Sequence, residues 1–122
     1  MEIIYSSIKD IEGLYNVLGD EARLKVLYML TEMGEACVRD IQQVLKVPQP
    51  TVSRHLGYLK RMGLVENHRR GKWNYYFIVK QQPEIVKHHL AALKSNQAYR
   101  KIFSHEMQPL LDKLLPRPKV RK

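Results

Sequence analysis

The sequence has little cysteine and no long apolar run. Among its 122 residues Cys37 is the single cysteine, so no disulfide can form within the chain. The apolar runs are only a few residues long, which excludes a membrane-spanning helix of about 20 apolar residues. The N-terminal stretch lacks the basic and apolar regions of a signal peptide. We therefore expect one compact cytoplasmic domain with no membrane partner.

The motifs that mark common catalytic sites are also missing from the sequence. It contains no HExxH zinc motif, no glycine-rich phosphate loop and no paired-carboxylate site, and Cys37 has no evident catalytic partner. We therefore predict that the protein is not an enzyme and requires no cofactor.

What the sequence does have is positive charge concentrated in one segment. The formal net charge is +9, yet residues 1–45 carry −4 and residues 46–72 carry +6. A basic excess scattered along the chain would fit a solvated surface as well as it fits a polyanionic partner. Concentration into one short segment favours a polyanionic partner such as nucleic acid.

The spacing of apolar residues predicts a mainly helical chain with one β-hairpin. Helical periodicity covers six ranges: 6–18, 21–33, 37–46, 49–62, 83–96 and about 99–115. Alternation of period two over residues 64–79, interrupted by the charged turn 67–72, predicts the hairpin. Residues 116–122 are expected to form a basic disordered tail. This order of elements is typical of a winged helix-turn-helix domain.

The helix over residues 49–62 has an unusual outer face. Its inner stripe consists of Val52, Leu56 and Leu59, and the opposite side carries Pro50, Arg54, Gly57 and Arg61. A glycine costs roughly 1 kcal/mol relative to alanine in a helix, which favours close approach by a large partner. Arginines flanked by the hydroxyl groups of Thr51, Ser53 and Tyr58 suit a major groove and its phosphates. The alternative is an ordinary solvated helix.

The predicted hairpin tip adds a second basic feature. Arg69, Arg70 and Lys72 surround Gly71 and would place three cations on a flexible loop beside the helix. Such a loop suits a minor groove or its phosphate walls. A basic turn alone is a weak signal. Because it lies next to the helix over 49–62 in the chain, it strengthens the prediction of DNA binding.

Three segments resemble the ArsR/SmtB family of winged-helix transcriptional repressors: LGDEARLKVLYML, VRDIQQVLKVPQPTVSRHLGYLKRMGLVE and RRGKWNYYFI. The resemblance covers roughly residues 10–80. It implies a sequence-specific repressor with one domain, residues 1–115, that binds a palindromic double-stranded operator as a homodimer. The apolar helices over 6–18 and 83–115 would join the two copies, or would simply complete the core of one copy. A non-specific or architectural nucleic-acid-binding protein is the alternative function.

The resemblance also implies which residues lie at the DNA. The residues predicted to contact DNA combine those implied by the resemblance with the neighbouring residues of the outer face and of the wing. They are Gln49, Thr51, Ser53, Arg54, His55, Tyr58, Arg61, Arg69, Arg70 and Lys72. For His55 a hydrogen bond at the edge of the core is an open alternative, because it lies only about 60° from the inner stripe.

The sequence departs from the family at the sites that sense inorganic signals. The arsenic-type site resembles Cys-Val-Cys-Asp-Leu-Cys, whereas residues 37–42 read Cys-Val-Arg-Asp-Ile-Gln and keep one thiolate. The zinc-type Asp-x-His pair is replaced by residues 80–82. Cys37 is thus a weak candidate for arsenite or another thiol-seeking effector. A small buried apolar residue or an incidental surface cysteine is an equal alternative. The remaining possible ligands are Glu84, His88, His89, His105 and Glu106.

Overall fold

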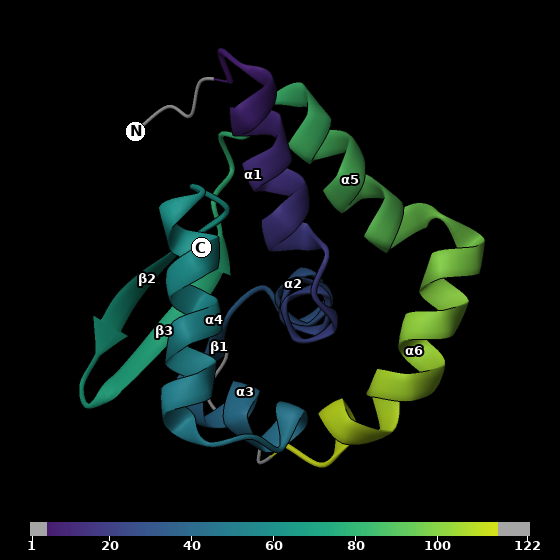
Figure 1. The fold of residues 1–122 in the computed structure, drawn as a ribbon. Helices are drawn as coiled ribbons and strands as arrows, with labels where there is room; N and C mark the ends of the chain where they lie inside the picture. Colours follow the sequence, from purple (N-terminus) through teal and green to yellow (C-terminus); the bar gives the residue numbers. More distant parts are fainter. Residues whose placement is uncertain (1–4, 115–122) are drawn as a thin grey trace.

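The computed structural model describes residues 5–114, which form six helices with a small sheet on one side (Figure 1). The helices are α1 (Ile8–Leu18), α2 (Glu21–Met33), α3 (Val38–Leu45), α4 (Gln49–Arg61), α5 (Glu84–Ser95) and α6 (Gln97–Asp112). The strands are β1 (Ala36–Cys37), β2 (Val65–Arg70) and β3 (Trp73–Ile78). No helix in this part of the chain is long and apolar enough to cross a membrane. The predicted tail, residues 116–122, lies outside the described residues.

Side chains at the helix starts fix several of these bounds. Ser7 accepts a hydrogen bond from the backbone N–H of Asp10 at the start of α1. Asp20 does the same for Arg23 at the start of α2. Between α3 and α4, Lys46 adopts a left-handed backbone conformation with φ 58°, which turns the chain sharply toward α4.

The centre of the fold is α2, which is buried on most sides. Five consecutive residues, Val26 to Leu30, are each 2% exposed or less. Figure 1 shows α2 end-on, with α4 on one side and α6 on the other. It contacts α1, α3, α4, α5, α6 and two strands. Because it touches so many elements, α2 fixes how they lie relative to one another.

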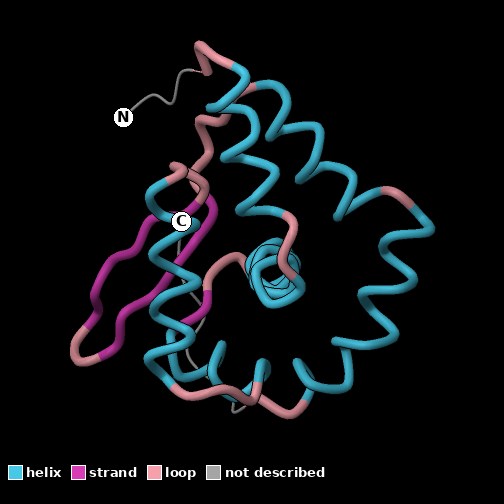
Figure 2. Tube along the Cα trace, viewed as in Figure 1, coloured by secondary structure: helices cyan, strands magenta, loops and turns pink. Residues whose placement is uncertain are grey.

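The sheet is antiparallel in the order β1-β3-β2, and β2 with β3 forms the wing (Figure 2). The predicted turn over residues 67–72 was too long: β2 continues to Arg70, and only Gly71 and Lys72 connect the strands. Gly71 supplies the positive φ, 61°, that a two-residue hairpin turn needs. The two-residue strand β1 was not predicted, since it is too short to show a period.

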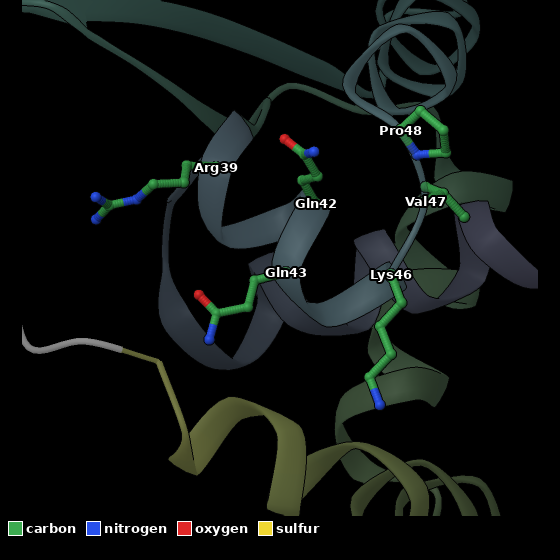
Figure 3. A pocket seen from close by; sticks show the side chains of 6 residues that line it. All are labelled: Arg39, Gln42, Gln43, Lys46, Val47 and Pro48. Carbon is green, nitrogen blue, oxygen red and sulfur yellow. The ribbon is translucent and has the colours of Figure 1, made fainter.

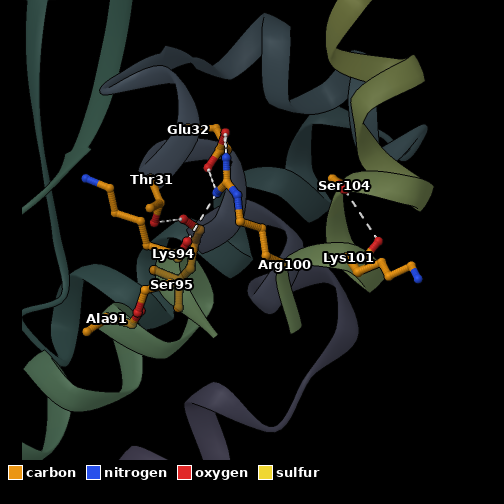
Figure 4. Close-up of polar contacts among 9 residues, drawn as sticks. Thr31, Glu32, Ala91, Lys94, Ser95, Arg100, Lys101 and Ser104 are labelled. Carbon is orange, nitrogen blue, oxygen red and sulfur yellow. Dashed lines mark hydrogen bonds and ion pairs between the residues drawn. The ribbon is translucent and has the colours of Figure 1, made fainter. Parts of the chain in front are cut away.

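The C-terminal helix α6 is fastened to α2 by a salt bridge and an aromatic stack. Arg100 Nη1 lies 2.7 Å from Glu32 Oε2 and also donates to the backbone oxygen of Lys94 (Figure 4). The rings of Tyr28 and Phe103 stack with centroids 5.0 Å apart. These contacts make α6 part of the same domain as α2.

Candidate nucleic-acid interface

The inner side of α4 is anchored in the core as predicted. Val52, Leu56 and Leu59 are each 1% exposed or less. On the opposite side, Arg54 and Arg61 are exposed. Burial of one stripe therefore sets which side chains α4 presents outward.

The outward side of α4 carries ordered polar groups near its start. Gln49 Nε2 donates a hydrogen bond to Ser53 Oγ at 2.9 Å, which links two exposed side chains one turn apart. At Gly57 an added Cβ would meet only the end of Arg61, 3.6 Å away. Internal packing therefore does not require a glycine there. The surface above Gly57 is free for close approach from outside.

Tyr58 lies between two guanidinium groups. The Arg23 and Arg61 guanidinium carbons lie 4.6 Å and 5.0 Å from the centre of its ring. Such cation–π contacts restrain long side chains. Tyr58 thereby holds Arg61 against α4 and joins it to α2.

His55 does not lie on the outward side of α4. Its side chain is 12% exposed, and its Nδ1 lies 4.0 Å from Asp20 Oδ1. Burial lowers the pKa of the His55 imidazole, which favours the neutral form. The structure thus places His55 at the edge of the core, the alternative left open by the helix geometry, and not in the expected line of DNA contacts.

The base of the wing is tied to the end of α4. Lys60 Nζ donates to Asn67 Oδ1 at 2.7 Å, and Asn67 Nδ2 donates to Asn74 Oδ1 at 2.9 Å. Arg69 and Lys72 are exposed at the tip, and Lys72 Nζ lies 5.2 Å from the Trp73 ring centre. Two of the three predicted wing cations are thus presented to solvent.

The third predicted wing cation, Arg70, points elsewhere. Its guanidinium lies 2.6 Å from Glu35 Oε2 and 3.9 Å from the centre of the Tyr75 ring. His68 Nε2 lies 3.1 Å from the other oxygen of Glu35. Neighbouring residues of a strand face opposite sides, so Arg69 and Arg70 cannot both face one groove. We call Glu35, His68, Arg70 and Tyr75 the wing lock.

The carboxylate of the wing lock is held in its charged form. Burial works to raise the pKa of Glu35, but the hydrogen bonds from Arg70 and His68 outweigh it and lower that pKa. The Glu35 side chain is 10% exposed. A buried carboxylate paired with the Arg70 guanidinium therefore joins the loop after α2 to the wing.

A second polar surface beside α4 was not predicted. Residues of α3 and of the turn after it line a shallow hollow: Arg39, Gln42, Gln43, Lys46, Val47 and Pro48 (Figure 3). In helix-turn-helix proteins the first helix of the pair crosses the DNA backbone. Neither Lys46 nor Arg39 was among the residues predicted to lie at the DNA. Their exposed polar neighbours on α3 were the signal that could have identified them.

The candidate metal ligands are not brought together. Among residues 5–114 no group of three His, Cys, Asp or Glu side chains could hold a metal ion. Glu84 and His88 lie 3.6 Å apart, but both side chains are largely exposed. Cys37 is 2% exposed at the start of α3.

A helix pair whose second helix presents arginines outward, with a two-stranded wing beside it, defines a winged helix-turn-helix DNA-binding protein. Residues 20–67 match the family described as bacterial regulatory protein, arsR family. A helix-turn-helix-type transcriptional regulator of Methanocaldococcus jannaschii is 44% identical over 75 residues, 61% of this chain and 84% of that protein. The chain therefore belongs to the ArsR family, whose members are DNA-binding transcriptional regulators and not enzymes.

Two further proteins show the extent of the similarity. The arsenical resistance operon repressor of Escherichia coli is 43% identical over 63 residues, which are 52% of this chain and 54% of the repressor. The chain thus spans about half the length of that relative. A homodimeric winged helix-turn-helix DNA-binding domain from Mycobacterium bovis is 28% identical with a TM-score of 0.61, covering 80% of this chain and 85% of that domain.

We expect Glu35→Gln to lower the melting temperature by a few degrees at neutral pH, because it removes the charged acceptor of the wing lock. The pKa of Glu35 is lower in the folded than in the unfolded protein, so this stabilisation is present above the unfolded pKa. It is lost as the pH falls through the folded pKa. Thermal melts at a series of pH values from about 7 to about 3 should therefore show the two proteins converging in acid.

Glu66→Gln is the matched control, because Glu66 is an exposed carboxylate on β2, the strand that carries His68 and Arg70, and it lies 4.0 Å from Lys60. Its melting temperature should stay close to that of the unchanged protein at every pH in the series. The difference in melting temperature between Glu35→Gln and the unchanged protein should shrink in acid. If it persists or widens there, the charge-based explanation is contradicted.

Proposed function

We propose that this regulator is a repressor that recognises a specific double-stranded DNA sequence through the outward side of α4. The observation that carries the proposal is the anchored helix whose exposed side combines arginines, hydroxyl groups and an open glycine. The residues proposed to face the major groove are Gln49, Thr51, Ser53, Arg54, Tyr58 and Arg61. Arginine reads guanine edges, and the polar side chains suit bases or phosphates.

The wing and α3 have a different role in this proposal. Arg69 and Lys72 at the exposed tip contact phosphates, as does Lys46 after α3. Arg70 acts indirectly, because its bond to Glu35 fixes the direction of the wing. His55 acts from the inner side by positioning α4.

The repressor binds its operator as a homodimer. A palindromic site needs two copies of α4 about 34 Å apart. Exposed apolar side chains on α1 support this assembly. Among residues 5–114 no element of one copy covers them, and Ile8 is 86% exposed and Tyr15 59% exposed. The related Mycobacterium bovis domain is described as homodimeric.

The inorganic signal of the family does not transfer directly to this chain. A trivalent arsenic atom takes about three thiolates, and this sequence supplies Cys37 alone. That thiol is buried at the junction of β1 and α3. An arsenite response would need α3 to open and the partner's thiol to approach.

We expect Arg54→Ala to weaken binding to a preferred duplex, selected from a random pool, by about 1 to 3 kcal/mol. Binding to a scrambled duplex should change much less, because the lost contact is to a base. Arg69→Ala should weaken both duplexes alike and reduce the salt dependence. Fluorescence anisotropy at several salt concentrations measures these effects.

Lys87→Ala on α5 removes an exposed cation far from α4 in sequence and is the matched charge control. Equal losses on both duplexes for Arg54→Ala would remove its base-reading role. A specificity ratio near one for the unchanged protein would instead support the non-specific architectural alternative.

We expect Ile8→Glu to dissociate the homodimer, because a charge on this exposed apolar site cannot be buried between two copies. Sedimentation equilibrium should show a mass near that of one chain. Glu12→Gln changes an exposed polar side chain on the same helix and should leave the dimer intact. A dimer that survives Ile8→Glu would place the interface elsewhere.

We expect arsenite to leave the DNA complex intact, because one buried thiol cannot complete the coordination of arsenic. Anisotropy of the bound duplex during an arsenite titration measures this. Release of DNA that disappears in Cys37→Ser would contradict the expectation and assign a sensing role to Cys37.

A further inference from the structure

A hollow of about 570 Å³ lies between the start of α2 and the middle of α6. Its apolar lining comes from Leu24, Ile102, Phe103 and Met107. The volume lies within the range of about 300 to 1,000 Å³ that is usual for small-molecule sites. Figure 1 shows α6 curving past α2 on the side away from α4. The α6 wall lies outside the part of the chain that matches the family, residues 20–67.

The edge of the hollow carries more negative than positive charge. Asp20, Glu21 and Glu106 line it together with one cation, Lys25. Lys25 Nζ is already paired with Glu21 at 2.9 Å. Within residues 5–114 no side chain forms an ion pair with the exposed Glu106. An apolar lining with an unpaired carboxylate at its edge is complementary to an organic cation.

We infer that this hollow binds a small organic cation with an aromatic or aliphatic body, such as an aryl or alkyl ammonium compound. The body packs against Leu24 and Phe103, and the charged group lies toward Glu106. One face of the Phe103 ring stacks on Tyr28, so the ring is held in place. An anion of the same shape is excluded by the acidic edge.

The hollow is connected to α4 through the start of α2. Asp20 lines it and also caps α2, and the Asp20 carboxylate lies 3.6 Å from Arg23 Nη2 and 4.0 Å from His55 Nδ1. Arg23 in turn lies over the ring of Tyr58. A positive charge bound in the hollow beside Asp20 weakens the attraction between that carboxylate and Arg23, and so loosens the inner support of α4. This coupling rests on the proposed function, whereas the binding itself does not.

Isothermal titration calorimetry of the full chain with benzyltrimethylammonium chloride tests the binding. We expect one site per chain with a dissociation constant in the millimolar to micromolar range. Phenylacetate, an anion with a similar ring, should not bind. Glu106→Gln should weaken cation binding roughly threefold to tenfold, whereas Glu84→Gln, an exposed carboxylate on α5, should not change it.

Several outcomes would overturn the inference: no binding, equal binding of phenylacetate, or unchanged affinity in Glu106→Gln. Ile102→Asp separates a competing explanation, because Ile102 is 58% exposed at this site. One combined result would assign the hollow to a second copy of the chain: the unchanged protein binds no cation, and Ile102→Asp sediments with a lower mass than the unchanged protein.

The effect on DNA is measured separately by anisotropy. The cation should weaken DNA binding severalfold, and by linkage DNA should weaken cation binding by the same factor. Failure of the protein to bind any duplex would contradict the proposed function and leave the calorimetric result valid. Saturable cation binding with unchanged DNA affinity would overturn the coupling alone.

Discussion

The burial of α2 is the constraint on which the rest of the structure depends. Its side chains from Val26 to Leu30 are all inaccessible, so every surrounding element must pack against it in one arrangement. Helix α4 is held from within by this packing and by its own apolar stripe. Core packing does not determine the identity of Arg54, Gly57 and Arg61 on its outward side. A rigid inner side and a free outer side are what a helix needs to read a groove reproducibly.

The wing shows how one strand separates two roles. Arg69 and Arg70 are adjacent, yet strand alternation sends one to solvent and the other to Glu35. The cation that turns inward sets the direction of the wing, and the cation that turns outward adds charge beside α4. Lys60 and Asn67 fasten the same wing to the end of α4. The two positive surfaces are therefore held in a fixed relation, which favours binding to a ligand of regular shape such as duplex DNA.

Local patterns were sufficient for the helices and for the inner stripe of α4, because each depends on residues within one or two turns. The partner of Arg70 was not predictable, since Glu35 is 35 residues away and nothing in the local pattern joins them. The position of His55 depends on Asp20 in the same way. The turn of the wing was predicted too long because its charged residues resemble a loop, although they continue the ladder with β3. Long-range pairs of polar residues thus limited the prediction of the site.

The surfaces that can transmit a signal to α4 are those that reach its inner side. Cys37 begins α3, but the sequence offers it no second thiolate, so metalloid coordination within one copy cannot move that helix. The start of α2 is better placed, because Asp20 and Arg23 contact His55 and Tyr58 on α4. Helix α6 closes a hollow against this same end of α2. A ligand there acts on the capping residue of the central helix, and a small shift at that cap is passed to α4 because the packed core between them cannot absorb it.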